Sequence, residues 1–284
     1  MRYRDKASAR QAVWDTLQRK RVARFPFPPH GRIPNFAGAR QAAERLLAHP
    51  LFERVRVIKV NPDSPQRWVR QLALERGITV ITPTPRLKGA FRVLDPRRIP
   101  REHYADAATL KRGGKWGDDV TLAQMPKVDL VVMGSVAVTR DGRRLGKGHG
   151  YADLEYALLR ELGNPAVPLA TTVHPLQVLD AFPVEAHDTP LTLIATPDEL
   201  IEMKRRRRAP RGIDWKRLPK EALEAMPVLA ELRARRAAAS RASRAGTARK
   251  GARGRRSSPS SSPHCCSRQR SQPVRPRRSA RARR

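Results

Sequence analysis

Every second residue is glycine in the segment Gly146-Lys-Gly-His-Gly-Tyr151, and Arg144 and Lys147 place positive charge beside it. Glycines let backbone N–H groups turn toward an anion without a Cβ in the way, and the positive end of a following helix favours phosphate. The segment therefore predicts a loop that binds a phosphate-bearing nucleotide, with ATP as the expected ligand. The alternative is a flexible turn between a strand and a helix. The spacing matches neither the dinucleotide fingerprint nor the Walker pattern.

Two aspartates near this loop are candidates for holding a metal ion. Asp153 lies in the first turn of a helix predicted from Tyr151, and Asp188 lies just before the last predicted strand. Mg²⁺ takes carboxylate ligands of this kind when it bridges phosphate oxygens. Each aspartate also has a structural interpretation, because an acidic side chain at Asp153 complements the helix dipole and Asp188 suits a turn.

Cations and rings elsewhere could complete such a site. Lys6 and Arg10 are four positions apart on the first predicted helix, where like charges repel. A shared anion would turn that repulsion into a stabilising contact, and the alternative is a solvated basic face. His149 is expected either to contact a phosphate or to be exposed. Trp116 is the tryptophan that we expect to stack on a ring ligand.

The pattern of apolar residues predicts the elements that position these groups. Short β-rich runs at 55–60, 78–82, 128–133, 169–173 and 191–196 alternate with helical segments such as 66–76 and 151–162. Two further helices are predicted at 4–24 and 36–48. Such alternation favours an α/β fold with a mostly parallel sheet and helices on both sides. The glycine loop would then follow the carboxyl end of the strand at 128–133, where open α/β sheets bind ligands.

Other stretches are less regular. The segment 86–127 is predicted to be a long, largely irregular excursion, because prolines and glycines interrupt it. After residue 196 we expect a short helix that ends in the basic run 204–208. A strongly helical pattern follows at 219–239.

Composition divides the chain near residue 240. Residues 240–284 contain fourteen Arg, one Lys and no Asp or Glu, and they carry 15 of the +33 net charge. Such a segment is expected to be disordered, since it has too little apolar surface to bury. We therefore expect a domain at 1–216, a helical extension at 217–239 and a disordered tail at 240–284. The tail is typical of an arm that binds nucleic acid nonspecifically, and the alternative is a functionally neutral extension.

Cysteine and hydropathy patterns add two expectations. The only cysteines, Cys265 and Cys266, are adjacent in the tail, so the body depends on neither disulfides nor a cysteine zinc site. No apolar run reaches the roughly 18 residues of a membrane span, and the N-terminus lacks a signal sequence. The expected location is the cytoplasm, with no membrane partner.

Several of these motifs resemble one family. The segment Arg144-Leu-Gly-Lys-Gly-His-Gly-Tyr-Ala-Asp153 resembles the Arg-Leu-Gly-x-Gly-x-Gly-Tyr-Tyr-Asp signature of the 5-formyltetrahydrofolate cyclo-ligases, also called methenyltetrahydrofolate synthetases. Lys6-Ala-Ser-Ala-Arg10 is similar to the Lys-x-x-x-Arg pair on that family's first helix. The blocks Lys59-Val-Asn-Pro-Asp-Ser-Pro-Gln66 and Gly134-Ser-Val-Ala-Val138 resemble a narrower subgroup, the methenyltetrahydrofolate synthase domain-containing proteins. The likeness covers residues 5–216.

The resemblance implies a three-layer α/β/α sandwich and a chemistry. ATP phosphorylates the formyl oxygen of 5-formyltetrahydrofolate, a neighbouring folate nitrogen attacks, and phosphate leaves as the ring closes to 5,10-methenyltetrahydrofolate. Mg²⁺ would be held by Asp153 and Asp188. The folate-type substrate would lie near Asn61, Asp63, Ser64, Trp116 and Tyr151. The residues implied to hold ATP are Lys6, Arg10, Arg144, Leu145, Gly146, Lys147, Gly148, His149, Gly150, Tyr151 and Ala152.

The sequence departs from the family pattern in the folate half of the site. Ala152 replaces the second Tyr of the signature, and the family's Glu after the first strand falls near Ser64, with Asp63 as the nearest carboxylate. Hydrogen-bonding groups in a pocket decide which substrate it accepts. Three hypotheses follow: a cyclo-ligase acting on 5-formyltetrahydrofolate, a non-catalytic nucleotide- or folate-binding module with RNA-binding character, or the same chemistry on another small substrate.

Overall fold

The computed structural model describes residues 2–84, 91–148, 150–185, 187–204, 207–216, 218, 223–224 and 226–238. The chain divides into two units, Met1–Arg233 and Ala234–Arg284. His149 and the predicted tail at 240–284 lie outside the described residues, so the expected nucleic-acid contact of the tail stays a prediction, as do the domain boundaries at 216 and 239. Within the described ranges, every helix is too short or too polar to traverse a lipid bilayer.

A large sheet forms the centre of the first unit. Among the described residues it has eight strands in the order β13-β12-β10-β7-β3-β4-β5-β6. The middle strands β12, β10, β7, β3 and β4 are parallel to one another, whereas β13, β5 and β6 add to the two edges in antiparallel fashion. The α/β class with a mostly parallel sheet is therefore confirmed. The bounds are β3 Val57–Val60, β4 Thr79–Pro83, β5 Phe91–Leu94, β6 Asp118–Val120, β7 Leu130–Val132, β10 Leu169–Thr172, β12 Leu193–Ala195 and β13 Leu200–Glu202.

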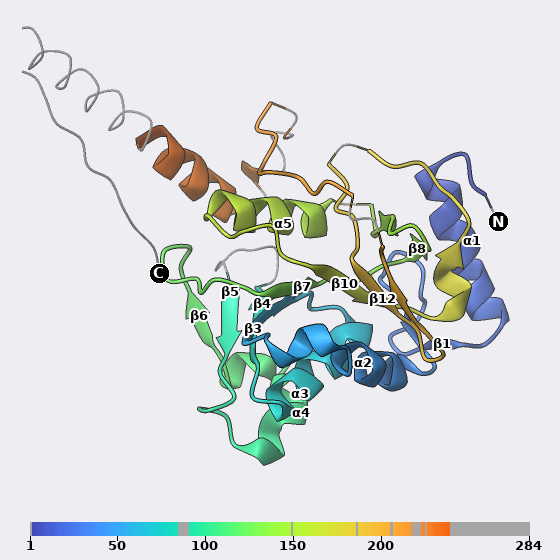
Figure 1. The fold of residues 1–284 in the computed structure, drawn as a ribbon, viewed down its shortest axis with the longest axis horizontal. Coiled ribbons are helices and arrows are strands. Elements are labelled where there is room, and N and C mark those ends of the chain that lie inside the picture. Colours follow the sequence, from blue (N-terminus) through green and yellow to red (C-terminus); the bar gives the residue numbers. More distant parts are fainter. Residues whose placement is uncertain are drawn as a thin grey trace, which may run out of the picture. The chain divides into compact units, whose positions relative to one another are not determined.

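Helices cover both faces of this sheet, which gives three layers (Figure 1). On one face lie α2 (Ala39–Leu47), α3 (Arg67–Glu75) and α4 (Tyr104–Ala107), and α5 (Tyr151–Glu161) lies on the other. Strand residues alternate between the two layers. In β3, Ile58 and Val60 pack against α2 and α3, so Lys59 between them is directed to the α5 side. A charged side chain in an apolar strand therefore faces the layer that carries the glycine loop.

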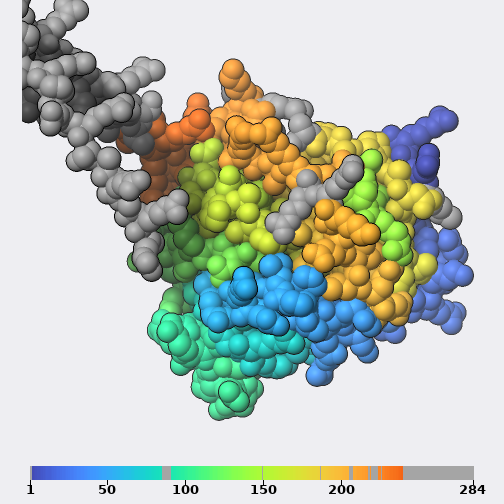
Figure 2. Space-filling view, viewed as in Figure 1, coloured from blue at the N-terminus to red at the C-terminus, as the bar shows by residue number. Residues whose placement is uncertain are grey.

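A second, smaller sheet links the large sheet to the N-terminus. Its strands are β8 (Ala137–Thr139), β9 (Arg144–Leu145) and β11 (Val178–Leu179), in the order β11-β8-β9. Helix α1 (Lys6–Arg19) packs on it through Ala9, Val13 and Leu17. A further pair of short strands, β1 (Ala23–Arg24) and β2 (Asn35–Phe36), follows this helix. Figure 2 shows the blue N-terminal residues beside the yellow segment near 175–182, and the backbone of Tyr3 donates to the carbonyl of Ala181.

The structure corrects three predicted elements. The predicted helix at 4–24 begins at Lys6, after the cap Asp5, and ends at Arg19, because Arg21 adopts a left-handed φ of 55°. The segment 86–127 contains more regular structure than predicted, since β5, α4 and β6 lie within it and two of them extend the sheet. The short helix expected after residue 196 is instead the edge strand β13, which pairs antiparallel with β12. The segment 227–238 is helical as predicted.

Candidate functional site

The glycine loop connects β9 to α5, because the β8–β9 hairpin separates it from the central strand β7. Gly148 has a φ of 111° and Gly150, the residue before α5, has a φ of 69°. L-residues rarely adopt these values, so the two glycines let the chain turn into the helix and leave the N-terminus of α5 uncapped by a side chain. A helix start that lacks such a cap is suited to a bound anion.

Arg144 and Asp153 form a buried ion pair at the base of this loop. The guanidinium donates to Asp153 Oδ2 at 2.5 Å and to the carbonyl of Gly134 at 3.1 Å. Its Nε is enclosed and has no hydrogen-bond partner among the described residues. Arg144 therefore fixes the first turn of α5 against the end of β7 and still has one N–H to offer.

Thr189 completes the surroundings of Asp153. Its backbone N–H and its hydroxyl both donate to Asp153 Oδ1, at 3.0 and 2.6 Å. Burial by itself raises the pKa of Asp153, but the charge of Arg144 and the hydrogen bonds from Thr189 and Arg144 outweigh it, so the pKa lies below its usual value. Asp153 is thus held as a carboxylate next to the loop.

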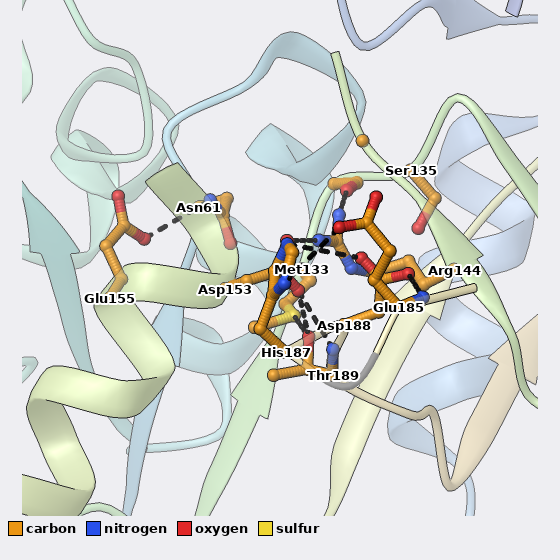
Figure 3. Close-up of polar contacts among 12 residues, drawn as sticks. Asn61, Met133, Ser135, Arg144, Asp153, Glu155, Glu185, His187, Asp188 and Thr189 are labelled. Carbon is orange, nitrogen blue, oxygen red and sulfur yellow. Dashed lines mark hydrogen bonds and ion pairs between the residues drawn. The ribbon is translucent and has the colours of Figure 1, made fainter. Parts of the chain in front are cut away.

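Lys6 holds the second predicted metal ligand. Its Nζ donates to both carboxylate oxygens of Asp188, at 2.9 and 2.8 Å, and to Glu185 Oε1 at 3.0 Å. Asp188 immediately precedes Thr189, and Thr189 contacts Asp153. The two predicted metal ligands, Asp153 and Asp188, therefore lie in one cluster. Figure 3 shows Glu185, Asp188 and Thr189 beside Arg144 and Asp153. The structure brings together residues from α1, β9, α5 and the segment before β12.

Arg10 reaches the loop from α1. Its Nε donates to the carbonyl of Gly146 at 2.7 Å, and a Cβ on Gly148 would lie 3.5 Å from its guanidinium carbon. Burial lowers the pKa of Arg10, the positive charge of Arg144 lowers it further, and Asp188 opposes that shift. A bound anion would therefore relieve the crowding of positive charge between Arg10 and Arg144.

A pocket of about 180 Å³ lies between the glycine loop and the segment after β3. Lys147 pairs with Asp63 across it at 3.1 Å. The predicted residues that line it are Asn61, Asp63, Arg144, Gly146, Lys147, Gly150, Tyr151, Ala152 and Asp153. A second pocket of about 310 Å³ is lined by Asp188, Thr189 and several arginines, and Arg144 borders both pockets.

Some predicted residues lie elsewhere. Leu145 is buried in the core beneath α1, and Ser64 begins a short 3₁₀ turn before α3. Trp116 stacks on His103 with ring centroids 4.2 Å apart. None of these three is among the described residues that line either pocket. Trp116 therefore packs against other side chains of the protein.

Sequence reasoning missed several groups that shape the site. Thr189 carried no signal, because a threonine after an aspartate is common in turns. Lys59 did carry one, since it interrupts the apolar run of β3, and it pairs with Glu155 of α5. Glu155 lines the first pocket. Arg70 of α3 donates to the carbonyl of Asn61 and so fixes the segment after β3.

Comparisons with known proteins agree on one family. A sequence model described as the 5-formyltetrahydrofolate cyclo-ligase family matches residues 2–197. The methenyltetrahydrofolate synthase domain-containing protein of Mus musculus is 43% identical over 230 residues, covering 79% of this chain and 62% of that protein. The Homo sapiens protein of the same name is 38% identical over 230 residues, covering 79% and 60%. The chain thus spans about three fifths of the length of these curated relatives.

Two solved structures are similar at low sequence identity. The NMR structure of Aquifex aeolicus 5,10-methenyltetrahydrofolate synthetase is 16% identical, with a TM-score of 0.45, and covers 72% of this chain and 96% of that one. A 5,10-methenyltetrahydrofolate synthetase from Mycoplasma pneumoniae is 14% identical, with a TM-score of 0.41, and covers 70% and 99%.

Proposed function

Because the chain belongs to the 5-formyltetrahydrofolate cyclo-ligase family, we propose that it is an ATP- and Mg²⁺-dependent enzyme that converts 5-formyltetrahydrofolate to 5,10-methenyltetrahydrofolate. The γ-phosphoryl group of ATP passes to the formyl oxygen, which leaves ADP. A neighbouring folate nitrogen then attacks the formyl carbon, the ring closes, and phosphate departs with the formyl oxygen. The cytoplasm stays the predicted location.

The observation that carries this proposal is the pairing of charges around Thr189. Lys6 and Arg144 are cations of the kind that bind phosphate, and each is paired with a carboxylate, Asp188 and Asp153 respectively. Paired in this way, the charges are neutralised before any ligand arrives. A metal–phosphate ligand carries both signs of charge, so each partner can exchange its protein contact for a ligand contact. A site for a metal–nucleotide complex uses both sets of charges.

The donor set fits Mg²⁺. No cluster of three or more His, Cys, Asp or Glu side chains suited to a metal occurs among the described residues. Mg²⁺ does not need one, because it keeps several waters and commonly binds one or two carboxylates together with substrate phosphates. Asp153 and Asp188 would supply those carboxylates. The ion would contribute neutralisation of the phosphate charge.

The residues of the chain would mainly bind and orient the reactants. Backbone N–H groups of Gly146–Gly150 and the N-terminus of α5 would hold phosphate oxygens, and the enclosed Nε of Arg144 would donate to one of them. Phosphoryl transfer needs little covalent chemistry from a protein, since positioning and charge stabilisation provide most of the rate enhancement. The described site accordingly needs no nucleophilic side chain.

A single assay tests the proposal. The purified full chain is incubated with Mg-ATP and 5-formyltetrahydrofolate, and the methenyl chromophore is followed together with ADP and phosphate. We expect the three products to appear in equal amounts. Absence of the chromophore from protein that still binds ATP would reject the cyclo-ligase activity and favour a binding module or a different small substrate.

A further inference from the structure

Lys59 and Glu155 form a buried ion pair beside the pocket. The Lys59 side chain is 0% exposed and that of Glu155 is 7% exposed, and they join the middle of β3 to the second turn of α5. Lys59 Nζ also donates to Asn61 Oδ1 at 3.2 Å. Asn61 Nδ2 donates to Glu155 Oε2 at 3.4 Å (Figure 3). Lys59, Asn61 and Glu155 thus form one hydrogen-bonded group, which we call the Lys59 cluster.

Only one oxygen of Glu155 takes part in this cluster. Both Lys59 and Asn61 contact Oε2, whereas Oε1 has no hydrogen-bond partner among the described residues. Oε1 is also not one of the enclosed side-chain atoms that lack a partner. Glu155 is one of the residues that line the pocket, so Oε1 is the carboxylate oxygen left to accept a hydrogen bond from a ligand there.

The surrounding structure holds this carboxylate in place. Arg70 of α3 donates to the carbonyls of Asn61 and Asp63, at 2.5 and 3.3 Å, and to that of Ala108 at 2.8 Å. Burial lowers the pKa of Arg70 to about 10 despite the nearby charge of Asp63, so the guanidinium stays charged at neutral pH. Arg70 therefore fixes Asn61, and Asn61 orients Glu155.

A buried ion pair of this kind has an energetic disadvantage. Removing two charges from water is costly, and apolar residues of similar size are often at least as stabilising. The layer that Lys59 faces is otherwise aliphatic, since its neighbours on the adjacent strands, Ile81 and Val131, are fully buried there. Stability of the fold alone therefore gives no reason for the Lys59 cluster, whereas an unpaired acceptor on a residue that lines a pocket has a role in binding.

The remaining walls of the pocket suit a flat ring. Ile33, Pro83 and Met226 line it with apolar groups, and Ala152 contributes only a methyl group. Charged groups of Asp63, Arg144 and Lys147 line the pocket as well. Apolar walls beside a fixed acceptor are the usual form of a site that binds a heterocycle by its faces and recognises one edge. The occupant implied by this chemistry is a fused heterocycle that carries an exocyclic amino group.

We propose that Glu155, oriented by Lys59 and Asn61, binds the amino-bearing edge of the substrate's pteridine ring and so determines which substrate the site accepts. The proposal rests on the proposed function, since it assigns the folate-type substrate to this pocket. Glu155 is on the helix that follows the glycine loop, so the same helix would hold phosphate at its N-terminus and the ring one turn later. The second substrate would thereby be positioned relative to the first.

The test compares Glu155→Gln with wild type in the full chain. The amide can direct its oxygen to Lys59, which leaves its NH₂ group facing the pocket, so an acceptor is replaced by a donor. We expect the Kd for 5-formyltetrahydrofolate to rise about 10- to 100-fold, the loss typical of a charged hydrogen bond. The Kd for Mg-ATP should change by less than about twofold. Glu161→Gln, on the same helix but outside both pockets, is the matched control and should leave both Kd values unchanged.

A second ligand tests whether Glu155 binds the 2-amino group of the pteridine ring. In an analogue of 5-formyltetrahydrofolate, a methyl group replaces the 2-amino group. Wild type should bind this analogue about tenfold more weakly than the parent, whereas Glu155→Gln should show no preference for the parent. If Glu155→Gln does not fold, as judged by thermal unfolding, Lys59→Met/Glu155→Gln removes the unpaired buried cation and is compared in its place.

The outcomes distinguish a failure of the role proposed for Glu155 from a failure of the proposed cyclo-ligase activity. Methenyl product from wild type with unchanged folate affinity in Glu155→Gln would overturn the role of Glu155 and leave the cyclo-ligase activity intact. Glu155-dependent folate binding without product would support the role and reject the activity. A Glu155→Gln variant that loses affinity for ATP but not for folate would assign the carboxylate to adenine and overturn the proposal, as would wild-type protein that does not bind folate.

Discussion

The guanidinium of Arg144 donates to Asp153 at 2.5 Å and to the carbonyl of Gly134 at 3.1 Å, and its Nε is enclosed without a partner among the described residues. One side chain thus joins β9, the end of β7 and the first turn of α5, and it keeps a donor for a ligand. A lysine at this position can place one charge but cannot make the same set of directed contacts.

Arg144→Lys should therefore weaken ATP binding. We expect the Kd for ATP to rise about 10- to 100-fold, because a charge-assisted hydrogen bond to phosphate is lost and Asp153 is less well held. Equilibrium binding of ATP to the purified variants measures this. Arg140→Lys is the control, since Arg140 pairs with Glu199 instead and lines neither pocket. Similar Kd values for wild type and Arg144→Lys would contradict the assignment of Arg144 to the nucleotide.

The pH dependence of stability should report on Asp153. Its pKa is below the usual 3.8 in the folded protein, so the unfolded chain binds more protons than the folded one in the window just below that value. The free energy of unfolding should include the full contribution of Asp153 above the unfolded pKa and lose it as the pH falls through the folded pKa. Urea unfolding at a series of pH values checks this. Asp153→Asn should flatten the acid limb of the curve, and an unchanged limb would show that Asp153 is not the group responsible.

Gly148 should tolerate a side chain poorly. Its φ of 111° is outside the range that L-residues adopt readily, and a Cβ there would lie 3.5 Å from the guanidinium of Arg10. Gly148→Ala is expected to destabilise the loop by about 1–3 kcal/mol and to weaken ATP binding. Gly31→Ala is the matched control, because Gly31 also has a positive φ of 70° but no atom within 4 Å of the added methyl group. Its ATP affinity should equal that of wild type, so equal losses in both variants would argue against a phosphate-binding loop.

An element of this fold was predictable from the sequence when its own residues favour it, and was missed when it depends on a neighbouring strand. The buried strands β3, β4, β7, β10 and β12 follow from apolar runs and lie within the predicted ranges, apart from Pro83 at the end of β4. Strand β6 was missed because two of its three residues are aspartates, and β13 was missed because it is only three residues long and leads into a basic run that was predicted to end a helix. Both lie at the edges of the sheet and exist because a neighbouring strand offers them hydrogen bonds.

The same distinction applies to the site. The loop from Gly146 to Gly150 and the following helix start are adjacent in sequence, so their pattern is readable directly. Thr189 contacts Asp153 across 36 positions, and Lys59 contacts Glu155 across 96. Such contacts form only once the distant elements have packed together. No local pattern in a single sequence shows which elements become neighbours. Lys59 was recognisable only as an anomaly within β3.

Lys6 provides the sharpest test of the charge exchange on which the proposed function depends. In the free protein its ammonium group contacts both oxygens of Asp188 and one of Glu185, at 2.8 to 3.0 Å. It therefore competes with any divalent cation for these carboxylates, yet it would assist ATP by binding a phosphate. Lys6→Met should consequently change two affinities in opposite directions.

Without ATP, the variant should bind Mn²⁺, a spectroscopic substitute for Mg²⁺, about tenfold more tightly than wild type, because a positive charge next to the carboxylates is gone. With metal saturating, its Kd for ATP should rise about tenfold, since one phosphate contact is lost. Electron paramagnetic resonance of free Mn²⁺ measures the first value, and equilibrium dialysis measures the second. Lys20→Met, at the exposed end of α1, is the control for removal of a charge. A purely structural role for Lys6 would weaken both affinities together, so the opposite signs distinguish ligand exchange at Asp188 from simple loss of folding.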